Sequence, residues 1–273
     1  MFISPMLLHR VEEAFNDNSY ITELKLDGIR LLLTKFNSKV RLYTRHNNEV
    51  TSLFPELANI QLPDGIVLDG ELIVTDHEGK PDFEAMMERF KSKRSQHQIS
   101  FSVFDILYYK NDKTYSLPLL DRKELINKVI KEDTILINKV KWIEGNAIQY
   151  FDAVKQRDLE GIVIKKSDSK YKPQTRSHNW LKVINYKFED VYITGVRKDE
   201  FGLVLTFLNG QYAGVMEFMP LDAKKEFYRM FRDYVINEND SAWTLKPGIK
   251  INVKYRNLTK KGLLRIPSFV EWL

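Results

Sequence analysis

Residues 23–30 read Glu-Leu-Lys-Leu-Asp-Gly-Ile-Arg and lie between two apolar runs of β-type residues, 20–24 and 29–36. The Asp-Gly pair is a turn signal, so this segment predicts two strands that meet at a fixed turn. Lys25 stands at the end of the first strand, two residues before Asp27. A strand-end lysine becomes a nucleophile when burial or nearby cations disfavour its ammonium form. The alternative interpretation is a solvated lysine before a hairpin turn.

Further short β-type runs follow, and each ends in an ionisable or aromatic residue. Taken singly, Glu71 and Glu160 would be ordinary edge-strand acids, Phe104 would be a core residue and Arg45 would be a surface cation. The order in which these residues recur therefore carries more information than any one of them. The runs are Leu-Asp-Gly-Glu-Leu-Ile at 68–73, Phe-Ser-Val-Phe-Asp-Ile-Leu-Tyr at 101–108, Glu-Gly-Ile-Val-Ile-Lys-Lys at 160–166 and Trp180-Leu-Lys182.

Together and in this order, these segments resemble the ATP-dependent DNA ligases of the covalent nucleotidyltransferase superfamily. The resemblance covers nearly the whole chain, and the length of 273 residues fits the small bacterial and phage-type enzymes with two domains. It implies an α+β fold. An adenylation (nucleotidyltransferase) domain with antiparallel sheets is expected at 1–186, and an OB-fold β-barrel domain at 187–273.

The resemblance also implies a role for each matching residue. Lys25 is the lysine that would be adenylylated, and Glu71 and Glu160 are the carboxylates that would bind a metal ion. Two carboxylates suit a hard divalent cation, and cationic side chains suit phosphate oxygens. The residues expected to bind the nucleotide are Glu23, Asp27, Arg30, Arg45, Glu71, Phe104, Glu160, Lys165 and Lys182.

The implied activity is the sealing of nicks between a 5′-phosphate and a 3′-hydroxyl in duplex DNA, through a lysyl-AMP intermediate and a DNA-adenylate, in DNA replication or DNA repair. ATP and a divalent metal, Mg²⁺ or Mn²⁺, are the expected cofactors. Two alternatives share the first motif, namely an RNA ligase and a capping-type guanylyltransferase. A third is a catalytically dead nucleic-acid-binding module that has kept the fold.

The charge pattern of the C-terminal part predicts binding to nucleic acid. The net charge is +5, and residues 246–270 carry seven cations with no acid before Glu271. Cations interleaved with apolar strand residues suit a phosphate backbone, although a solvated surface is the alternative. We expect a monomer that binds nicked duplex DNA. The expected DNA-binding residues are Arg45, Lys250, Lys254, Lys260, Lys261 and Arg265.

Composition excludes several classes of protein. The chain has no cysteine, which excludes disulfides and cysteine-based zinc sites and argues against the longer NAD-dependent ligases. No run approaches the roughly 20 apolar residues that span a bilayer, so no membrane association is expected. The first ten residues lack the basic region of a signal peptide, and a cytoplasmic location is therefore expected.

Residue patterns predict the order of helices and strands. A short amphipathic helix is expected at 6–16, and further helices at 82–90, 118–131, 146–157 and 222–236. Asp82 is a suitable N-cap for the second of these helices. Strands are expected at 20–25, 29–36, 39–44, 66–74, 98–108, 161–166, 180–184, 189–197, 202–208, 211–217, 249–255 and 262–266.

The chain departs from the family pattern in two places. Ile184 stands where many ligases have a second lysine after the tryptophan, and the chain ends at Leu273, before the usual Arg-x-Asp-Lys. In the family, that terminal motif orients the pyrophosphate leaving group. We therefore expect slow self-adenylylation and comparatively fast sealing of a nick that already carries AMP.

Overall fold

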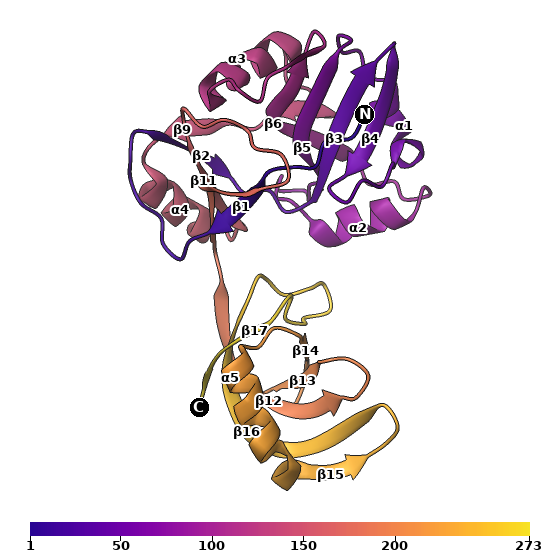
Figure 1. Ribbon diagram of the computed structural model, residues 1–273. Helices are drawn as coiled ribbons and strands as arrows, with labels where there is room; N and C mark the ends of the chain where they lie inside the picture. Colours follow the sequence, from indigo (N-terminus) through magenta and orange to yellow (C-terminus); the bar gives the residue numbers. More distant parts are fainter. The chain divides into compact units, whose positions relative to one another are not determined.

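The computed structural model describes residues 1–273, and the chain divides into two compact units (Figure 1). The first unit spans Met1–Ile184 and the second Asn185–Leu273. The division falls two residues before the boundary expected from the sequence. Both units contain mainly antiparallel sheets with a few helices, so the chain is an α+β protein as predicted. No helix is long and apolar enough to span a membrane.

One sheet of the first unit carries the lysine motif. Its inner strands are antiparallel, whereas the edge strand β1 pairs in parallel with β11. The run Gly-Ile-Val-Ile at the start of β10 is buried on both faces, as expected for a central strand rich in β-branched residues. The order of the five strands is β1 (Leu7–Arg10), β11 (Arg176–Ile184), β10 (Gly161–Lys166), β2 (Tyr20–Leu24) and β9 (Trp142–Glu144).

The second sheet of this unit has six strands. It is antiparallel except for β8, which pairs in parallel with β6. The residues of β3 and β5 are in register, with Arg30 opposite Glu71 and Leu32 opposite Asp69. The strands are β4 (Lys39–Thr44), β3 (Ile29–Phe36), β5 (Ile66–Val74), β6 (Ile99–Tyr109) and β7 (Asp112–Lys113), with β8 (Ile137–Lys139) beside β6.

Helices cover the outer faces of these sheets, and a shared core fills the space between them. The first helix packs against β4, the second against β5 and the third against β6, and the fourth packs against β10 and β2 (Figure 1). Ile21, Leu32, Val67 and Trp180 meet in one buried cluster, which joins the two sheets. The helices are α2 (Phe83–Lys91), α3 (Leu119–Val129) and α4 (Ala147–Gln156), with the short α1 (Pro55–Ala58) after a 3-10 turn at Thr51–Leu53.

Most expected elements of this unit are present within a few residues of their predicted bounds. The N-cap of α2 is confirmed, because the Asp82 carboxylate accepts a hydrogen bond of 2.9 Å from the Ala85 amide. The helix expected at 6–16 is wrong, since Leu7–Arg10 forms β1 instead. Its apolar residues also fit a strand, and pairing with β11 decides between the two conformations.

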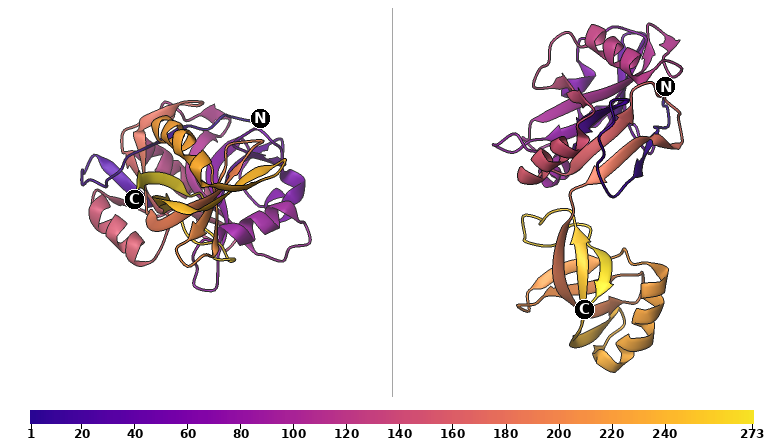
Figure 2. Two further views of the ribbon diagram at one scale, coloured as in Figure 1. Left: turned by 90° about the horizontal axis from the view of Figure 1, so that it is seen from below. Right: turned by 90° about the vertical axis from the view of Figure 1, so that its left-hand side faces the viewer.

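The second unit is a six-stranded antiparallel sheet with one helix, α5 (Leu221–Met230), which packs against the strands (Figures 1 and 2). A parallel bridge joins Phe218, just after β14, to Ser268 of β17, so the ends of the sheet meet and the strands close on themselves. The strands are β12 (Lys187–Arg197), β13 (Leu203–Phe207), β14 (Tyr212–Met216), β15 (Val235–Glu238), β16 (Ala242–Tyr255) and β17 (Ser268–Trp272).

Three expectations for this unit are wrong in detail. The strand expected at 249–255 begins earlier, at Ala242, and the helix expected at 222–236 gives way to a 3-10 turn at Phe231–Tyr234 and then to β15. The strand expected at 262–266 is absent. Ile266 has φ of 53°, a left-handed conformation that does not continue a strand, and the last strand begins at Ser268.

Candidate active site

Lys25 lies at the end of β2, where the backbone of β10 fixes its position. The Lys25 amide donates a hydrogen bond of 2.9 Å to the carbonyl of Gly161. The residue before that glycine, Glu160, forms an ion pair with Lys25, in which the ammonium nitrogen lies 2.8 Å from Oε2 of the carboxylate. These side chains are only 19% and 6% exposed. The two motifs therefore meet across neighbouring strands, although 135 residues separate their side chains in the sequence.

Gly161 is required at the start of β10. Its φ is +153°, and a Cβ placed there would lie 2.2 Å from the carbonyl oxygen of Val183. No side chain fits at that distance without moving the backbone. The glycine therefore permits the close pairing of β10 and β11 that places Glu160 beside Lys25.

Glu23 is buried between two lysines. Its Oε2 atom pairs with Lys165 at 2.6 Å, and its Oε1 atom pairs with Lys123, which the sequence analysis did not identify. The Lys165 ammonium also lies 4.5 Å from the ring centre of Phe104 and 4.1 Å from that of Trp180. Burial lowers the pKa of Lys165 to about 8, and the charge of Lys123 adds to this, whereas Glu23 opposes it.

Arg30 is held on the other side of the pocket by Asp69, a fully buried residue of β5. The guanidinium donates two hydrogen bonds to this carboxylate, of 2.9 and 2.6 Å, and a third of 2.8 Å to the carbonyl of Met6. The hydroxyl of Tyr171 donates to the same carboxylate at 2.7 Å. The Arg30 guanidinium lies 5.2 Å from the ring centre of Phe104.

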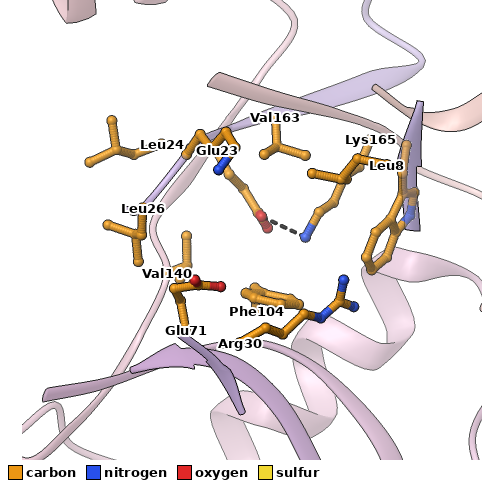
Figure 3. Close-up of a pocket in the computed structure, with 12 residues that line it drawn as sticks. Leu8, Glu23, Leu24, Leu26, Arg30, Glu71, Phe104, Val140, Val163 and Lys165 are labelled. Carbon is orange, nitrogen blue, oxygen red and sulfur yellow. Dashed lines mark ion pairs between the residues drawn. The ribbon is translucent and has the colours of Figure 1, made fainter. Parts of the chain in front are cut away.

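Several of the side chains described above line one pocket, together with Glu71. Figure 3 shows Glu23 and Lys165 converging from one side, with Phe104, Arg30 and Glu71 on the other. Burial raises the pKa of Glu71 to about 7, although Lys25 and Arg30 favour its charged form. The complete lining is Leu8, Glu23, Leu24, Lys25, Leu26, Arg30, Glu71, Phe104, Val140, Val163, Lys165 and Trp180.

Lys182 belongs to a group of cations near Lys25. It lies on β11 and is the register partner of Arg10 on β1. Burial lowers the pKa of Lys182, and so do the charges of Lys25, Arg176, Arg10 and Arg45, in decreasing order. Arg45 follows β4, and its side chain is exposed. Two arginines that the sequence analysis did not select, Arg10 and Arg176, thus lie near enough to Lys182 for their charges to act on it.

Most of the first unit matches a known protein family. A model described as "ATP dependent DNA ligase domain" matches residues 5–183. The chain belongs to this family. It is an ATP-dependent DNA ligase of the small bacterial type, as its motifs predicted.

Curated relatives agree with this assignment. The ligase is 50% identical over 272 residues to the SPbeta prophage-derived DNA ligase-like protein LigB of Bacillus subtilis, and the match covers 100% of this chain and 99% of that protein. It is 30% identical over 204 residues to the multifunctional non-homologous end joining DNA repair protein LigD of Mycobacterium tuberculosis. That match covers 73% of this chain but only 26% of the longer protein.

Solved structures share the fold of the ligase. The ligase domain of M. tuberculosis LigD matches with a TM-score of 0.62 and 24% identity, over 99% of this chain and 95% of that one. A Lig E DNA ligase matches with a TM-score of 0.70 and 15% identity, over 98% of this chain and 99% of that one.

The sequence analysis did not select several residues that support the site of this ligase. Asp69 and Tyr171 hold Arg30, and Lys123 holds Glu23. Arg122 pairs with Asp105 at 2.7 Å, and both side chains are fully buried. Asp69 comes directly before the Gly-Glu pair of its motif, in an apolar run. A charged residue at such a position could have been recognised from the sequence as a buried partner for a cation. Lys123 and Tyr171 gave no such signal, because they contact Glu23 and Arg30 from a helix and a loop.

The expected DNA-binding residues of the second unit lie on β16 and in the segment before β17. Lys250 pairs with Asp190 at 2.9 Å, and Lys254 lies 5.2 Å from the ring centre of Tyr186. Arg265 donates a hydrogen bond of 3.3 Å to the side chain of Asn257. Lys260 and Lys261 are exposed at the turn between Leu258 and Leu264, which form a bridge.

Proposed function

We propose that this ligase seals nicks in duplex DNA through an adenylylated Lys25. The observation that carries the proposal is the position of Lys25 in the pocket, with its ammonium 2.8 Å from Glu160. Five of the other residues expected to bind the nucleotide line the same pocket, namely Glu23, Arg30, Glu71, Phe104 and Lys165. The 50% identity to a DNA ligase-like protein over the whole chain supports the same function.

Lys25 would be the nucleophile of the first step. Its neutral amine forms a bond from nitrogen to the α-phosphorus of ATP, the bond to the β-phosphate oxygen breaks, and pyrophosphate leaves. The ammonium must first lose a proton. The charge of Lys182 favours that loss, because a nearby cation disfavours a second positive charge, whereas the ion pair with Glu160 opposes it. Glu160 holds the side chain in place until the proton departs.

The remaining two steps transfer the AMP and close the nick. An oxygen of the 5′-phosphate displaces Lys25 from the AMP phosphorus, which frees the amine and forms a DNA-adenylate. The 3′-hydroxyl oxygen then attacks the 5′-phosphorus, loses its proton and releases AMP. Each step is an in-line transfer, so the protein contributes alignment and charge neutralisation.

The pocket divides into an end for the base and an end for the phosphates. Phe104 offers a ring face on which a purine would stack, and Glu23 and Lys165 face it as hydrogen-bonding groups. Arg30, Asp27 and Arg45 would contact the ribose or phosphates. Lys182 and its neighbouring arginines would neutralise phosphate charge.

A divalent metal would be held by Glu71 and Glu160, since carboxylate oxygens are ligands that Mg²⁺ and Mn²⁺ accept. The structure contains no group of three or more acidic or histidine side chains arranged for a metal, so phosphate oxygens and water would complete the coordination. Sites built from one or two carboxylates and substrate phosphates are usual for Mg²⁺. When bound, the metal supplies neutralisation of phosphate charge.

The second unit would be an OB-fold that binds the duplex. Its closed strands and its single helix, α5, between β14 and β15 support this proposal. The cations expected to contact phosphates are Arg45 from the first unit and Lys250, Lys254, Lys260, Lys261 and Arg265 from the second.

The test is whether protein incubated with labelled ATP gains an acid-labile adduct on Lys25. The wild-type protein should gain the label, and Lys25→Ala should not, while retaining its fold. Sealing of nicked DNA should then require ATP and a divalent metal. A folded Lys25→Ala protein that takes up label would overturn the assignment. Label taken from GTP in preference to ATP would favour a guanylyltransferase, and sealing of RNA alone would favour an RNA ligase.

A further inference from the structure

Lys123 reaches the carboxylate of Glu23 from outside the pocket. It is 5% exposed, and its ammonium pairs with the Oε1 atom of Glu23, while Lys165 pairs with Oε2. Lys165 and Glu23 line the pocket, but Lys123 does not. One carboxylate is therefore held from two sides, by one lysine inside the pocket and by one behind it.

The helix that carries Lys123 is firmly anchored through the preceding residue. Arg122 donates two hydrogen bonds to Asp105, of 2.7 and 2.9 Å, and two more to the carbonyls of Leu117 and Ser169, of 2.6 and 2.9 Å. Its side chain is fully buried. Because Arg122 fixes the first turns of α3, Lys123 presents its charge at a fixed place, and Glu23 takes its orientation from that place.

The orientation of Glu23 matters because it determines which purine the pocket accepts. Adenine has an amino group that donates hydrogen bonds and a neighbouring ring nitrogen that accepts one. Guanine has the opposite arrangement, with an accepting oxygen and a donating ring nitrogen. A fixed carboxylate opposite the exocyclic group and an ammonium opposite the ring nitrogen match adenine. Guanine in the same place would set oxygen against oxygen.

We propose that Lys123 is a positioning residue for base selection, which fixes the Glu23 carboxylate so that the pocket accepts the adenine of ATP. The proposal rests on the proposed function, in which this pocket binds ATP with its base on Phe104. Without Lys123, the Glu23 carboxylate keeps only Lys165 as a cationic partner and turns toward it. Glu23 then no longer meets the amino group at the required angle.

The experiment measures adenylylation of Lys25 in single turnovers by Lys123→Met, which removes the charge and keeps much of the side-chain length. Two substrates are compared, ATP and purine riboside triphosphate, which lacks the amino group. The efficiency with ATP should fall about tenfold or more, the effect of losing a hydrogen bond to a charged group. The efficiency with purine riboside triphosphate should stay near that of the wild type, because no amino group is there to be read.

Comparing two substrates on one protein separates positioning from folding. A partly unfolded sample loses the same fraction of activity with both nucleotides, so the ratio of their efficiencies does not change. Lys123→Arg should restore the preference for ATP. Lys128→Met, an exposed position on the same helix, is the matched control and should change neither efficiency.

Equal losses with both nucleotides in Lys123→Met would overturn the proposal, because Lys123 would then act only on the fold. An unchanged efficiency with ATP would overturn it as well. The wild-type protein tests the proposed function separately. An adduct on wild-type Lys25 keeps that function standing whatever Lys123→Met does, whereas the absence of any adduct overturns both.

Discussion

The two units of this ligase use charge in different ways. In the first unit, several ion pairs are buried, as in Arg122–Asp105, where neither side chain is exposed. In the second unit, the charged side chains stay at the surface. The pair of Lys250 and Asp190 leaves 33% and 38% of the two side chains exposed.

This difference predicts which properties each set of charges controls. A buried pair is costly to break, because the remaining partner stays in the interior without compensation. An exposed cation is screened by salt and contributes little to stability, but it attracts phosphates over a longer range. Charges of the first unit should therefore determine fold and chemistry, and those of the second should determine affinity for DNA.

The largest expected effect follows from Asp69→Asn. This change removes the charge that balances Arg30 and weakens the hydrogen bonds from Arg30 and Tyr171. The free energy of unfolding of the first unit should fall by about 3–5 kcal/mol, as is usual when one partner of a buried pair is removed. Urea unfolding, followed by hydrogen exchange of amides in the first unit, measures it, because the fluorescence of Trp142 and Trp180 would be mixed with that of Trp243 and Trp272 of the second unit.

Asp190→Asn is the matched change in the second unit. It removes the charge that pairs with Lys250, keeps an oxygen that can accept from Asn252, and should leave the unfolding of both units nearly unchanged. If Asp69→Asn were as mild as Asp190→Asn, the contrast between buried and exposed pairs would not describe this molecule.

The next largest effect concerns DNA. Lys260→Glu together with Lys261→Glu should lower the affinity for nicked duplex about tenfold or more at low salt. If both lysines contact phosphates, the slope of log affinity against log salt should also become shallower by roughly 0.9 per contact. Fluorescence anisotropy over a salt series measures both quantities. Adenylylation with ATP should be unaffected, and unchanged DNA affinity would mean that this turn is only a solvated surface.

The smallest expected effect is a pH dependence of ATP binding. Because the pKa of Lys165 is lowered to about 8, this side chain is charged below that pH and loses its charge as the pH rises through it. Affinity for ATP should therefore fall a few-fold across this range. Calorimetry on Lys25→Ala separates binding from the covalent step. The variant that also carries Lys165→Met should bind ATP more weakly and with a flatter profile, whereas an identical profile would assign the titration to another group.

Much of the fold could be predicted because local patterns and tertiary structure agree. The alternating or continuous apolar runs of β3, β5 and β10 lie in the interior of sheets, where such runs belong. One clear failure lies at a sheet edge. Residues 7–10 have no strong local preference and become a strand only through parallel pairing with β11, which the neighbouring sequence does not encode.

The candidate site was predictable in part for a similar reason. Lys25, Glu71 and Glu160 each lie in a short sequence motif, so the sequence pattern alone identifies them as candidates. Lys123 does not, since its importance comes from Glu23, 100 residues away in the sequence. The metal and DNA contacts assigned to individual residues remain predictions, because they depend on bound partners.

The hydrogen bond from the Lys25 amide to Gly161 makes the geometry of the candidate active site as rigid as the sheet that contains it. The distance between a nucleophile and a neighbouring carboxylate usually depends on flexible side chains, so it varies with thermal motion. Here a backbone hydrogen bond between neighbouring strands sets that spacing. Mutations that weaken the pairing of β2 with β10 should lower the catalytic rate before they unfold the protein. The catalytic rate is therefore the most sensitive measure of distortion in this part of the molecule.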